Sequence, residues 1–335
     1  MSVTLKTVAQ KCGLPLSQVA TVLTQAARID GDTRQKVLDA ARDCGYPLDG
    51  LGKLTHNLGV LFVEENNSGL THPFFAAMIN SFKTEAEAHG YDITFINHNI
   101  GTEPATYLDH CRYRSVDGVF IARMDFNSRE VMELLTSDIP CVTADHCVPG
   151  QPSVNSDNRA GIRMLVDYAV SLGHKRIAFI HGQCNSRVTD DRVTEFRAAM
   201  RDHGLYLPDH FLVEARYGDL DLVRRIVREM VQQPERPSCI LLPDDTSYLG
   251  AQEAIRESEL RIPADISVAG YDGIALTQSL RPHLTTIRQN SEEMGRVAAL
   301  RLIEKIERPS AAVNDAVSIP VTLLKGETVG WCNNW

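Results

Sequence analysis

The 335-residue sequence has fewer basic than acidic residues, with 34 Lys and Arg against 43 Asp and Glu and a net charge of −9. Over the whole chain this balance argues against a polybasic nucleic-acid-binding protein. No apolar run reaches the ~18 residues that a membrane-spanning helix needs. The first residues also lack a basic stretch followed by an apolar one, so no secretory signal peptide is expected. The sequence therefore predicts a soluble, cytoplasmic protein of roughly two to three domains.

Sequence signatures of metal sites and of catalysis are missing as well. None of the eight cysteines forms a C-x-x-C pair or has histidine partners at zinc-finger spacing. Without an export signal, scattered cysteines are expected to be reduced thiols, many of them in the core. No nucleophile elbow, P-loop or G-x-G-x-x-G after a strand is present. We therefore expect no metal, no cofactor and no enzymatic activity.

The charge is unevenly distributed along the chain. Residues 1–57 hold seven basic and five acidic residues, which leaves 27 basic and 38 acidic residues in the remainder. A small, slightly basic N-terminal segment of charge +2 is therefore joined to an acidic body of charge −11. Because the two parts differ in sign, the total charge does not exclude DNA binding by the first.

The N-terminal segment has the pattern of three short helices. Apolar residues fall at helical spacing over 5–12 and again over 16–23, and Gly13-Leu14-Pro15 interrupts them. A third amphipathic stretch follows Asp32 and ends near Gly45. Two short helices around a tight turn are typical of the helix-turn-helix, whose second helix enters the major groove. A small helical bundle with no role in nucleic-acid binding fits the same pattern.

The body alternates short apolar runs with longer amphipathic ones. The predicted strands are 58–63, 92–97, 118–122, 141–145, 176–182, 239–243 and 266–272. The predicted helices between them include 74–89, 159–172, 192–202, 220–232 and 247–257. This alternation predicts parallel sheets covered by helices on both faces, and more than 260 residues require two such subdomains. Ligands of such sheets bind at the carboxyl ends of the strands, here in a cleft between the subdomains.

Several phrases resemble the LacI/GalR family of repressors. In the N-terminal segment they are Thr4-Leu5-x-x-Val8-Ala9, Gly13-Leu14, Val19-x-x-Val22-Leu23 and Thr33-Arg34-x-x-Val37. In the body they include Leu172-Gly173-His174-Lys175-Arg176-Ile177-Ala178, the stretch from Ile262 to Asp272, and Pro282-x-Leu284-Thr285-Thr286-Ile287-Arg288-Gln289. The matches cover essentially the whole chain.

The resemblance implies an α/β fold with two doubly wound parallel-sheet subdomains, of the periplasmic-binding-protein-like type I, behind a small all-α helix-turn-helix domain. We place the DNA-binding headpiece at 1–46, a short hinge at 47–57 and the effector-binding and dimerisation domain at 58–335. Within that domain, the first subdomain is expected at 58–155 plus 283–315, and the second at 156–282 plus 316–335.

The resemblance also implies which headpiece residues contact DNA. They are Thr4, Leu16, Ser17, Gln18, Thr21, Arg28, Thr33 and Arg34, with Leu54 or Leu51 as a wedge in the minor groove. The chain departs from the family pattern at one of these contact positions and in the turn. Thr21 stands where the family has a base-reading Arg, and Pro15 replaces a polar residue of the turn. The linker is about five residues shorter than usual, and Gly50 and Gly52 each weaken a hinge helix by roughly 1 kcal/mol relative to Ala.

Polar residues at predicted strand ends supply the chemistry for a polyol. Carboxylates and amides bridge neighbouring hydroxyls, arginine donates in a fork, and an aromatic ring covers the apolar face of a sugar. The candidate effector-binding residues are Asp272, Arg192, Asp244, Asp145, Asn66, Phe74 and Tyr217, and His72 and Arg123 are weaker candidates. Asp272 and Arg192 match effector-binding positions of the family. Any one aspartate at a strand end is alternatively a helix cap.

Three functions remain open at this point. The first is a ligand-responsive repressor that binds a pseudo-palindromic operator as a homodimer, with a sugar or sugar derivative as effector. The second is a protein that senses a ligand while its altered headpiece binds DNA weakly or with changed specificity. The third is a sugar-binding transport receptor, which the missing signal peptide and the N-terminal helices disfavour.

Overall fold

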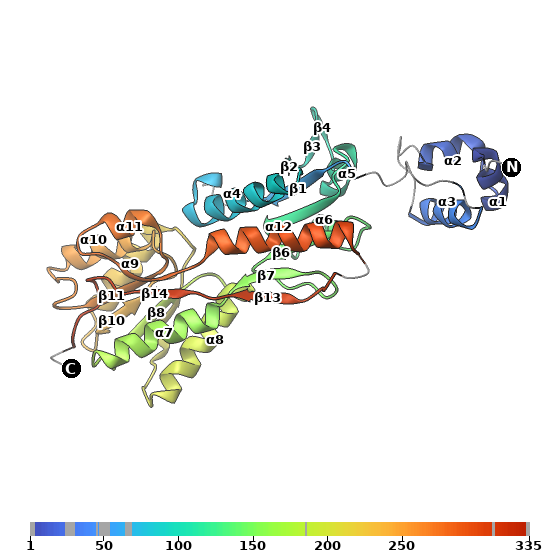
Figure 1. Cartoon of the computed structure of the whole chain (residues 1–335). Helices are drawn as coiled ribbons and strands as arrows, with labels where there is room; N and C mark the ends of the chain where they lie inside the picture. The colour runs from blue at the N-terminus through green and yellow to red at the C-terminus, as the bar shows by residue number, and fades with distance from the viewer. Residues whose placement is uncertain are drawn as a thin grey trace. The chain divides into compact units, whose positions relative to one another are not determined.

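The computed structural model describes residues 4–23, 31–44, 46, 54–63, 69–184, 186–309 and 312–332 of the chain. These residues form two compact units, Met1–Thr55 and His56–Trp335. The first unit contains the three short helices that the N-terminal pattern predicts, and the second contains the strands and helices of the body (Figure 1).

The first unit consists of helices α1 (Leu5–Cys12), α2 (Leu16–Leu23) and α3 (Gly31–Cys44). Val8, Val19 and Val37, one from each helix, are fully buried in a shared core. The backbone turns after α1 through Gly13, whose φ of 67° lies in the left-handed region that glycine adopts without strain. The helical spacing and the glycine turn of the sequence therefore produce the predicted helix-turn-helix arrangement.

The second unit contains two six-stranded sheets. The first has the order β13-β7-β6-β5-β1-β2, and the second has the order β14-β12-β11-β10-β8-β9. The strands of the first sheet are β1 (Asn57–Phe62), β2 (Asp92–Ile96), β5 (Gly118–Arg123), β6 (Cys141–Ala144), β7 (Ser153–Ser156) and β13 (Ala316–Ile319). Those of the second are β8 (Ile177–His181), β9 (Leu212–Glu214), β10 (Cys239–Leu241), β11 (Ser267–Asp272), β12 (Thr285–Arg288) and β14 (Thr322–Leu324). Every pair within the two sheets is parallel except β12 with β14, which confirms the predicted fold class.

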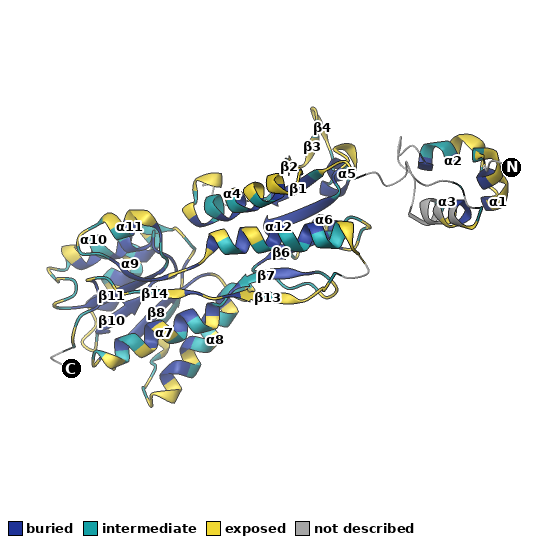
Figure 2. Cartoon of the chain, viewed as in Figure 1, coloured by how far each residue is buried: buried dark blue, intermediate teal, exposed yellow. Residues whose placement is uncertain are grey.

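Helices cover both faces of each sheet, so the strands are buried while one side of most helices is exposed (Figure 2). The helices of the first subdomain are α4 (Pro73–Ala88), α5 (Tyr107–Tyr113), α6 (Arg129–Leu135) and α12 (Ser291–Glu307). Those of the second are α7 (Asn158–Ser171), α8 (Arg187–Asp202), α9 (Leu220–Val231), α10 (Tyr248–Glu257) and α11 (Ala275–Ser279). Four apolar clusters result, two for each sheet.

The division of the C-terminal part of the chain between the two subdomains differs from the prediction. The sequence pattern assigned 283–315 to the first subdomain and 316–335 to the second. In the structure β12 pairs with β11 of the second sheet, and β13 pairs with β7 of the first. The prediction was wrong on these two strands because a strand joins the sheet that holds its long-range partner, which local hydrophobicity does not specify.

Helix α12 packs closely on α4 in the first subdomain, where Figure 1 shows the two helices side by side. Gly295 of α12 faces the backbone of α4, and a Cβ atom at this position would collide with the carbonyl oxygen of Met78. Phe82 of α4 stacks on Phe120 of β5 beneath this contact, with ring centroids 4.6 Å apart. The absence of a side chain at Gly295 therefore sets how closely the helix pair packs.

We expect Gly295→Ala to lower the free energy of unfolding by about 1–3 kcal/mol or more, because the two helices must separate to admit the methyl group. The matched control is Gly150→Ala. Gly150 has a φ of 79° but open space around its Cα, so this variant should cost only about 1 kcal/mol of backbone strain. Thermal unfolding of both variants tests the difference, and equal stability losses would contradict the close-packing argument.

Candidate functional site

The candidate site lies at the carboxyl ends of two strands from different sheets. Asp145 directly follows β6 of the first sheet, and Asp272 is the last residue of β11 of the second. Both have positive φ angles, 50° for Asp145 and 118° for Asp272. Residues in such sparsely populated conformations cluster at binding sites, and the carboxyl end of a parallel sheet is where ligands bind.

Arg192 of α8 is the buried cation of the site, with only 4% of its surface exposed. Its Nε donates a hydrogen bond to Asn158 Oδ1 over 2.8 Å, and its Nη1 donates to the carbonyl oxygen of Pro243 over 3.1 Å. The guanidinium also stacks on the ring of Tyr271, 3.5 Å from its centroid. These contacts fix the plane of the guanidinium, which has five N–H donors in total, before any ligand arrives.

The two aspartates of the site have raised pKa values. Burial raises the pKa of Asp145 to about 6, and its hydrogen bond from the Ser156 backbone and the charge of Arg192 oppose this rise. Burial also raises the pKa of Asp272 well above its usual range, and the neighbouring Asp245 and Asp244 add to the effect. The charge of Arg192 acts on both carboxyl groups, so the structure brings these three predicted residues together. A donor-rich ligand would stabilise the charged form of both aspartates.

Asp272 has a further partner that the sequence analysis did not select. Gln289 directly follows β12, and its Nε2 donates to Asp272 Oδ1 over 2.7 Å. The side chain is 5% exposed, and its Oε1 accepts no hydrogen bond from any described residue. Ser156 at the end of β7 and the hydroxyl of Tyr271 share this property. Sequence reasoning could have selected Gln289 and Ser156 from their position, because each of them ends or directly follows a strand.

Asp244 and Asp245 chiefly hold loops together. Asp244 accepts hydrogen bonds from the backbone N–H of Gly218 and of Ser247, both over 2.8 Å, and from the Ser247 hydroxyl. Asp245 accepts from the backbone of Ile274 and from two threonine hydroxyls, and burial raises its pKa to about 7. For Asp244 these bonds agree with the alternative that a strand-end aspartate caps a helix, because Ser247 immediately precedes α10.

Tyr217 lies beside the end of β8. A Cβ atom at Gly182 would collide with its ring, so glycine is required there. The Tyr217 hydroxyl lies 3.0 Å from Thr189 Oγ1 of α8, which ties the loop after β9 to the helix that carries Arg192. Burial raises the pKa of Tyr217, and Arg192 opposes that rise, which places the phenol close to the guanidinium.

The remaining predicted effector residues lie elsewhere. Phe74 is 7% exposed and belongs to the apolar core of the first subdomain. Its neighbour Phe75 is partly exposed and contacts the two weaker candidates, with Arg123 5.1 Å and His72 5.3 Å from its ring centroid. Asn66 lies outside the described residues. On a helix, adjacent positions point in different directions, and the sequence pattern did not distinguish Phe74 from Phe75.

In the headpiece, the start of α2 presents the predicted DNA-contacting residues to solvent. Leu16, Ser17 and Gln18 are exposed. The hydroxyl of Thr21 donates to the carbonyl oxygen of Ser17 over 2.7 Å, so it is partly occupied within the helix. Of the other predicted residues, Thr4 is exposed and Thr33 and Leu54 are partly exposed, whereas Arg28 and the side chain of Arg34 lie outside the described part of the chain.

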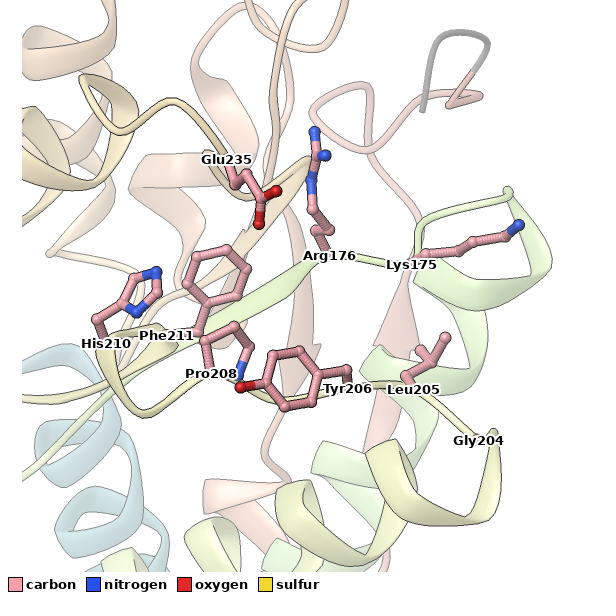
Figure 3. A pocket seen from close by; sticks show the side chains of 9 residues that line it. All are labelled: Lys175, Arg176, Gly204, Leu205, Tyr206, Pro208, His210, Phe211 and Glu235. Carbon is pink, nitrogen blue, oxygen red and sulfur yellow. The ribbon is translucent and has the colours of Figure 1, made fainter.

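A surface pocket of about 320 Å³ lies at the opposite end of the second sheet (Figure 3). Its lining includes Lys175 and Arg176, which precede β8, and Tyr206, His210 and Glu235. None of the predicted effector residues lines this pocket. In the described parts of the chain, no helix combines the length and the apolar character that crossing a membrane requires.

Comparison with known proteins agrees with the fold described above. Residues 55–327 match the family model of periplasmic binding proteins and the sugar-binding domain of the LacI family. The chain is 28% identical to the ribose operon repressor of Escherichia coli strain K12, over 96% of this chain and 99% of that protein. It is 26% identical to the HTH-type transcriptional repressor PurR of Haemophilus influenzae, over 95% of this chain and 96% of that protein. The structure of the lac repressor dimer bound to operator and an anti-inducer superposes on this chain with a TM-score of 0.70. The two are 25% identical, and the superposition covers 98% of this chain and 100% of that one.

We expect Asp145→Asn to stabilise the ligand-free protein above about pH 7. The folded state raises the pKa of Asp145 to about 6, so it binds a proton more tightly than the unfolded chain does. The aspartate therefore costs stability as the pH rises from about 4 to 6, by about 1–3 kcal/mol once it is ionised. Asparagine removes this cost, tolerates positive φ, and can still accept the bond from Ser156.

Thermal unfolding between pH 4 and 8 measures this effect. The gain should be complete above pH 7 and should become small near pH 4, where the folded Asp145 is protonated and the unfolded one is about half protonated. Asp209→Asn, at an exposed aspartate, is the control and should change the stability by less than about 0.5 kcal/mol. A variant less stable than wild type at pH 8 would show that Asp145 is stabilising as a charged group.

Proposed function

The chain belongs to the LacI/GalR family of ligand-responsive transcriptional regulators, and we propose that it represses transcription as a homodimer whose operator affinity is set by a small sugar. The observation that carries this proposal is the group formed by Arg192, Asp272 and Asp145. It combines a fixed donor fork with two carboxylates from separate sheets. A ring of neighbouring hydroxyls satisfies such a set, because each hydroxyl both donates and accepts.

Ligand binding would act by stabilising one arrangement of the two subdomains. Three segments connect the sheets, after β7, after β12 and after β13. The segment after β7 is hydrogen-bonded to the end of β13, because the Asp157 backbone N–H donates to the Ile319 carbonyl oxygen over 3.0 Å. A sugar that bridges Asp145 to Arg192 and Asp272 favours a closed cleft. The sugar changes operator affinity only to the extent that its own affinity differs between the open and the closed arrangement of the subdomains.

The sugar class follows from the charge of the site. Arg192 faces the carboxylates of Asp145 and Asp272, with Asp244 and Asp245 close to Asp272. The carboxyl groups outnumber the single guanidinium, so a phosphate next to Asp272 would add negative charge where the carboxyl groups already repel one another. This disfavours a phosphate and favours a neutral ligand rich in hydroxyl groups. The curated relatives include a ribose operon repressor, which supports a sugar or sugar derivative as the class to test.

A second candidate function rests on the headpiece. Thr21 stands where the family has an arginine, and its hydroxyl is bonded to Ser17 rather than projecting freely. Pro15, just before α2, replaces a polar residue of the turn. On this alternative the body senses its ligand, while the headpiece binds DNA weakly or reads a different sequence.

We expect Asp272→Asn to weaken sugar binding by about 10- to 100-fold, since it replaces charge-assisted hydrogen bonds by neutral ones. A thermal-shift screen of neutral sugars first identifies a ligand, because saturation at 100 times Kd adds about 2.7 kcal/mol of stability. Titration of wild type, Asp272→Asn and the exposed control Asp209→Asn then measures the loss. Unchanged affinity in Asp272→Asn would remove Asp272 from the site, and no shift with any sugar would refute the sugar class.

For the headpiece, we expect wild-type protein to protect a site in DNA upstream of the gene it controls. Gln18→Ala should lower this specific affinity by about 1–3 kcal/mol, or roughly 5- to 150-fold, because Gln18 is exposed on α2 and suited to a base edge. Gln10→Ala, at an exposed glutamine of α1, is the matched control and should change affinity little. Footprinting at a fixed salt concentration measures the DNA affinity of both variants.

The variant Thr21→Arg separates the two candidate functions. If wild type protects a site of its own, the headpiece is an active DNA-binding domain with its own specificity. If only Thr21→Arg gives specific protection, the natural headpiece has lost specific binding, and the repressor proposal is wrong.

A further inference from the structure

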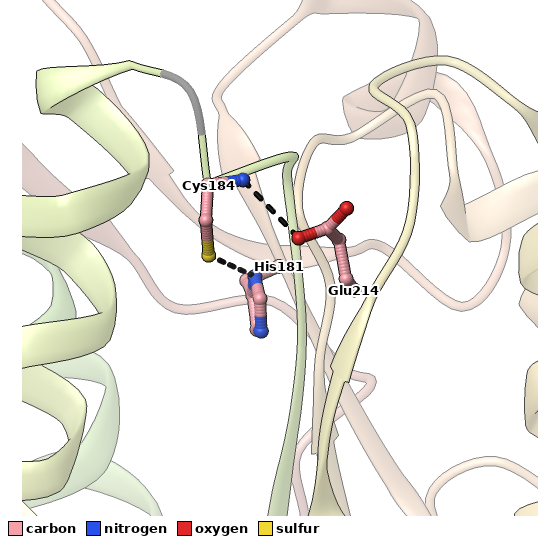
Figure 4. Close-up of side chains that lie close together, drawn as sticks. All are labelled: His181, Cys184 and Glu214. Carbon is pink, nitrogen blue, oxygen red and sulfur yellow. Dashed lines mark hydrogen bonds between the residues drawn. The ribbon is translucent and has the colours of Figure 1, made fainter.

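A second group of polar side chains lies at the carboxyl ends of the neighbouring strands β8 and β9 (Figure 4). His181 ends β8 and is in register with Glu214, which ends β9. Cys184 follows His181 by three residues. One candidate ligand atom from each side chain lies within 4.8 Å of the other two. Within the described ranges of the chain, this is the one group of three such side chains.

The loop after β8 holds the three side chains together. The backbone N–H of Cys184 donates to Glu214 Oε2 over 3.2 Å, and Cys184 Sγ lies 4.0 Å from His181 Nδ1. Figure 4 shows the thiol directed at the imidazole, with the carboxylate on the opposite side of the loop. His181 is buried, whereas Cys184 and Glu214 are exposed, so a solvated ion can reach the group.

We propose that His181, Cys184 and Glu214 bind a divalent transition cation of the zinc type. Thiolate, imidazole and carboxylate are the side-chain ligands that Zn²⁺ takes, whereas Mg²⁺ and Ca²⁺ require oxygen. Bonds of 2.0–2.3 Å in a tetrahedron place neighbouring ligand atoms about 3.3–3.8 Å apart. The candidate ligand atoms lie within 4.8 Å of one another, so the exposed Cys184 and Glu214 side chains must move closer to His181 to reach this spacing. A fourth position stays open to water.

The ion would displace protons and one hydrogen bond. His181 Nδ1 lies 2.7 Å from the carbonyl oxygen of Gly182, so without a metal this nitrogen carries the ring proton. Coordination through Nδ1 moves that proton to Nε2 and breaks the contact with Gly182. Partial burial and Glu214 raise the pKa of the Cys184 thiol, whose proton is also released when it binds the cation. These losses favour reversible binding over a permanently occupied structural site.

The position of the group connects it with the cleft. Cys184 lies just before α8, which carries Thr189 and Arg192, and Glu214 lies three residues before Tyr217. The bond between Thr189 and Tyr217 already joins these two segments near the predicted effector. A bound cation would join them a second time. If the cleft binds an effector, cation and effector then influence each other's affinity equally, because such coupling is reciprocal.

Calorimetric titration of the untagged, chelator-treated full-length protein with Zn²⁺ alone tests the site. We expect one ion per chain, and at least a 10-fold loss of affinity in both Cys184→Ser and Glu214→Gln. Both side chains are exposed, so the variants should fold. Cys147→Ser, at a partly buried cysteine of the first subdomain, is the matched control and should bind as wild type does.

A spectroscopic readout identifies the thiolate directly. Co²⁺ should give a thiolate-to-metal charge-transfer band in wild type and Cys147→Ser but not in Cys184→Ser. Equal binding of Zn²⁺ by wild type and Cys184→Ser, or no binding by wild type, would overturn the proposal. Since the cation is used alone, this outcome does not depend on the sugar or on the operator.

Discussion

The buried guanidinium of Arg192 is the interaction on which the rest of the candidate site depends. A cation that is 4% exposed remains in a protein only when it is paired and hydrogen-bonded. Here Asn158, the Pro243 carbonyl and the face of Tyr271 hold it, and Asp145 and Asp272 supply nearby negative charge. These partners come from four segments, namely the ends of β6, β10 and β11 and the start of α7, so one side chain connects four segments of the chain. The raised pKa values of the aspartates show that a single cation does not fully compensate them.

The fold provides this convergence because every strand but one of its two sheets runs parallel. Parallel strands end at the same edge, and side chains that follow them gather there without a dedicated loop. The loops are then fixed by the remaining carboxylates. Asp244 bonds the Tyr217 loop to the start of α10, and Asp245 bonds β12 to the start of α11. Asp244 and Asp245 thus support loops, whereas Asp145 and Asp272 face the guanidinium of Arg192, although all four follow or end strands.

Much of this arrangement was predictable from the sequence, and the failures have physical causes. The positions of β1, β2, β5, β6, β8, β10 and β11 followed from local hydrophobic pattern, whereas the short strands β7 and β9 were not predicted. The selection of Asp272 and Arg192 followed from the family phrases, and that of Asp145 from its place at a strand end. The assignment of β12 to the second sheet and of β13 to the first was not predicted, since it depends on pairing between distant segments. Phe74 was predicted to contact the ligand but lies in the core, because neighbouring residues of a helix point in different directions and the sequence does not show which of them faces the core. Gln289 was missed because its role comes from a contact with Asp272 across the sheet.

The crossing of the chain between the subdomains has a consequence for biosynthesis. The first subdomain needs α12 and β13, so its core lacks Met294, Leu302 and Ile319 until the segment from Ser291 onwards is being made. A ribosome-bound nascent chain that ends before Ser291 therefore carries an uncovered apolar face on α4. Completion of both subdomains is a late event at the end of translation. An early stop codon in this gene would yield an aggregation-prone fragment rather than a free headpiece with a folded partial body.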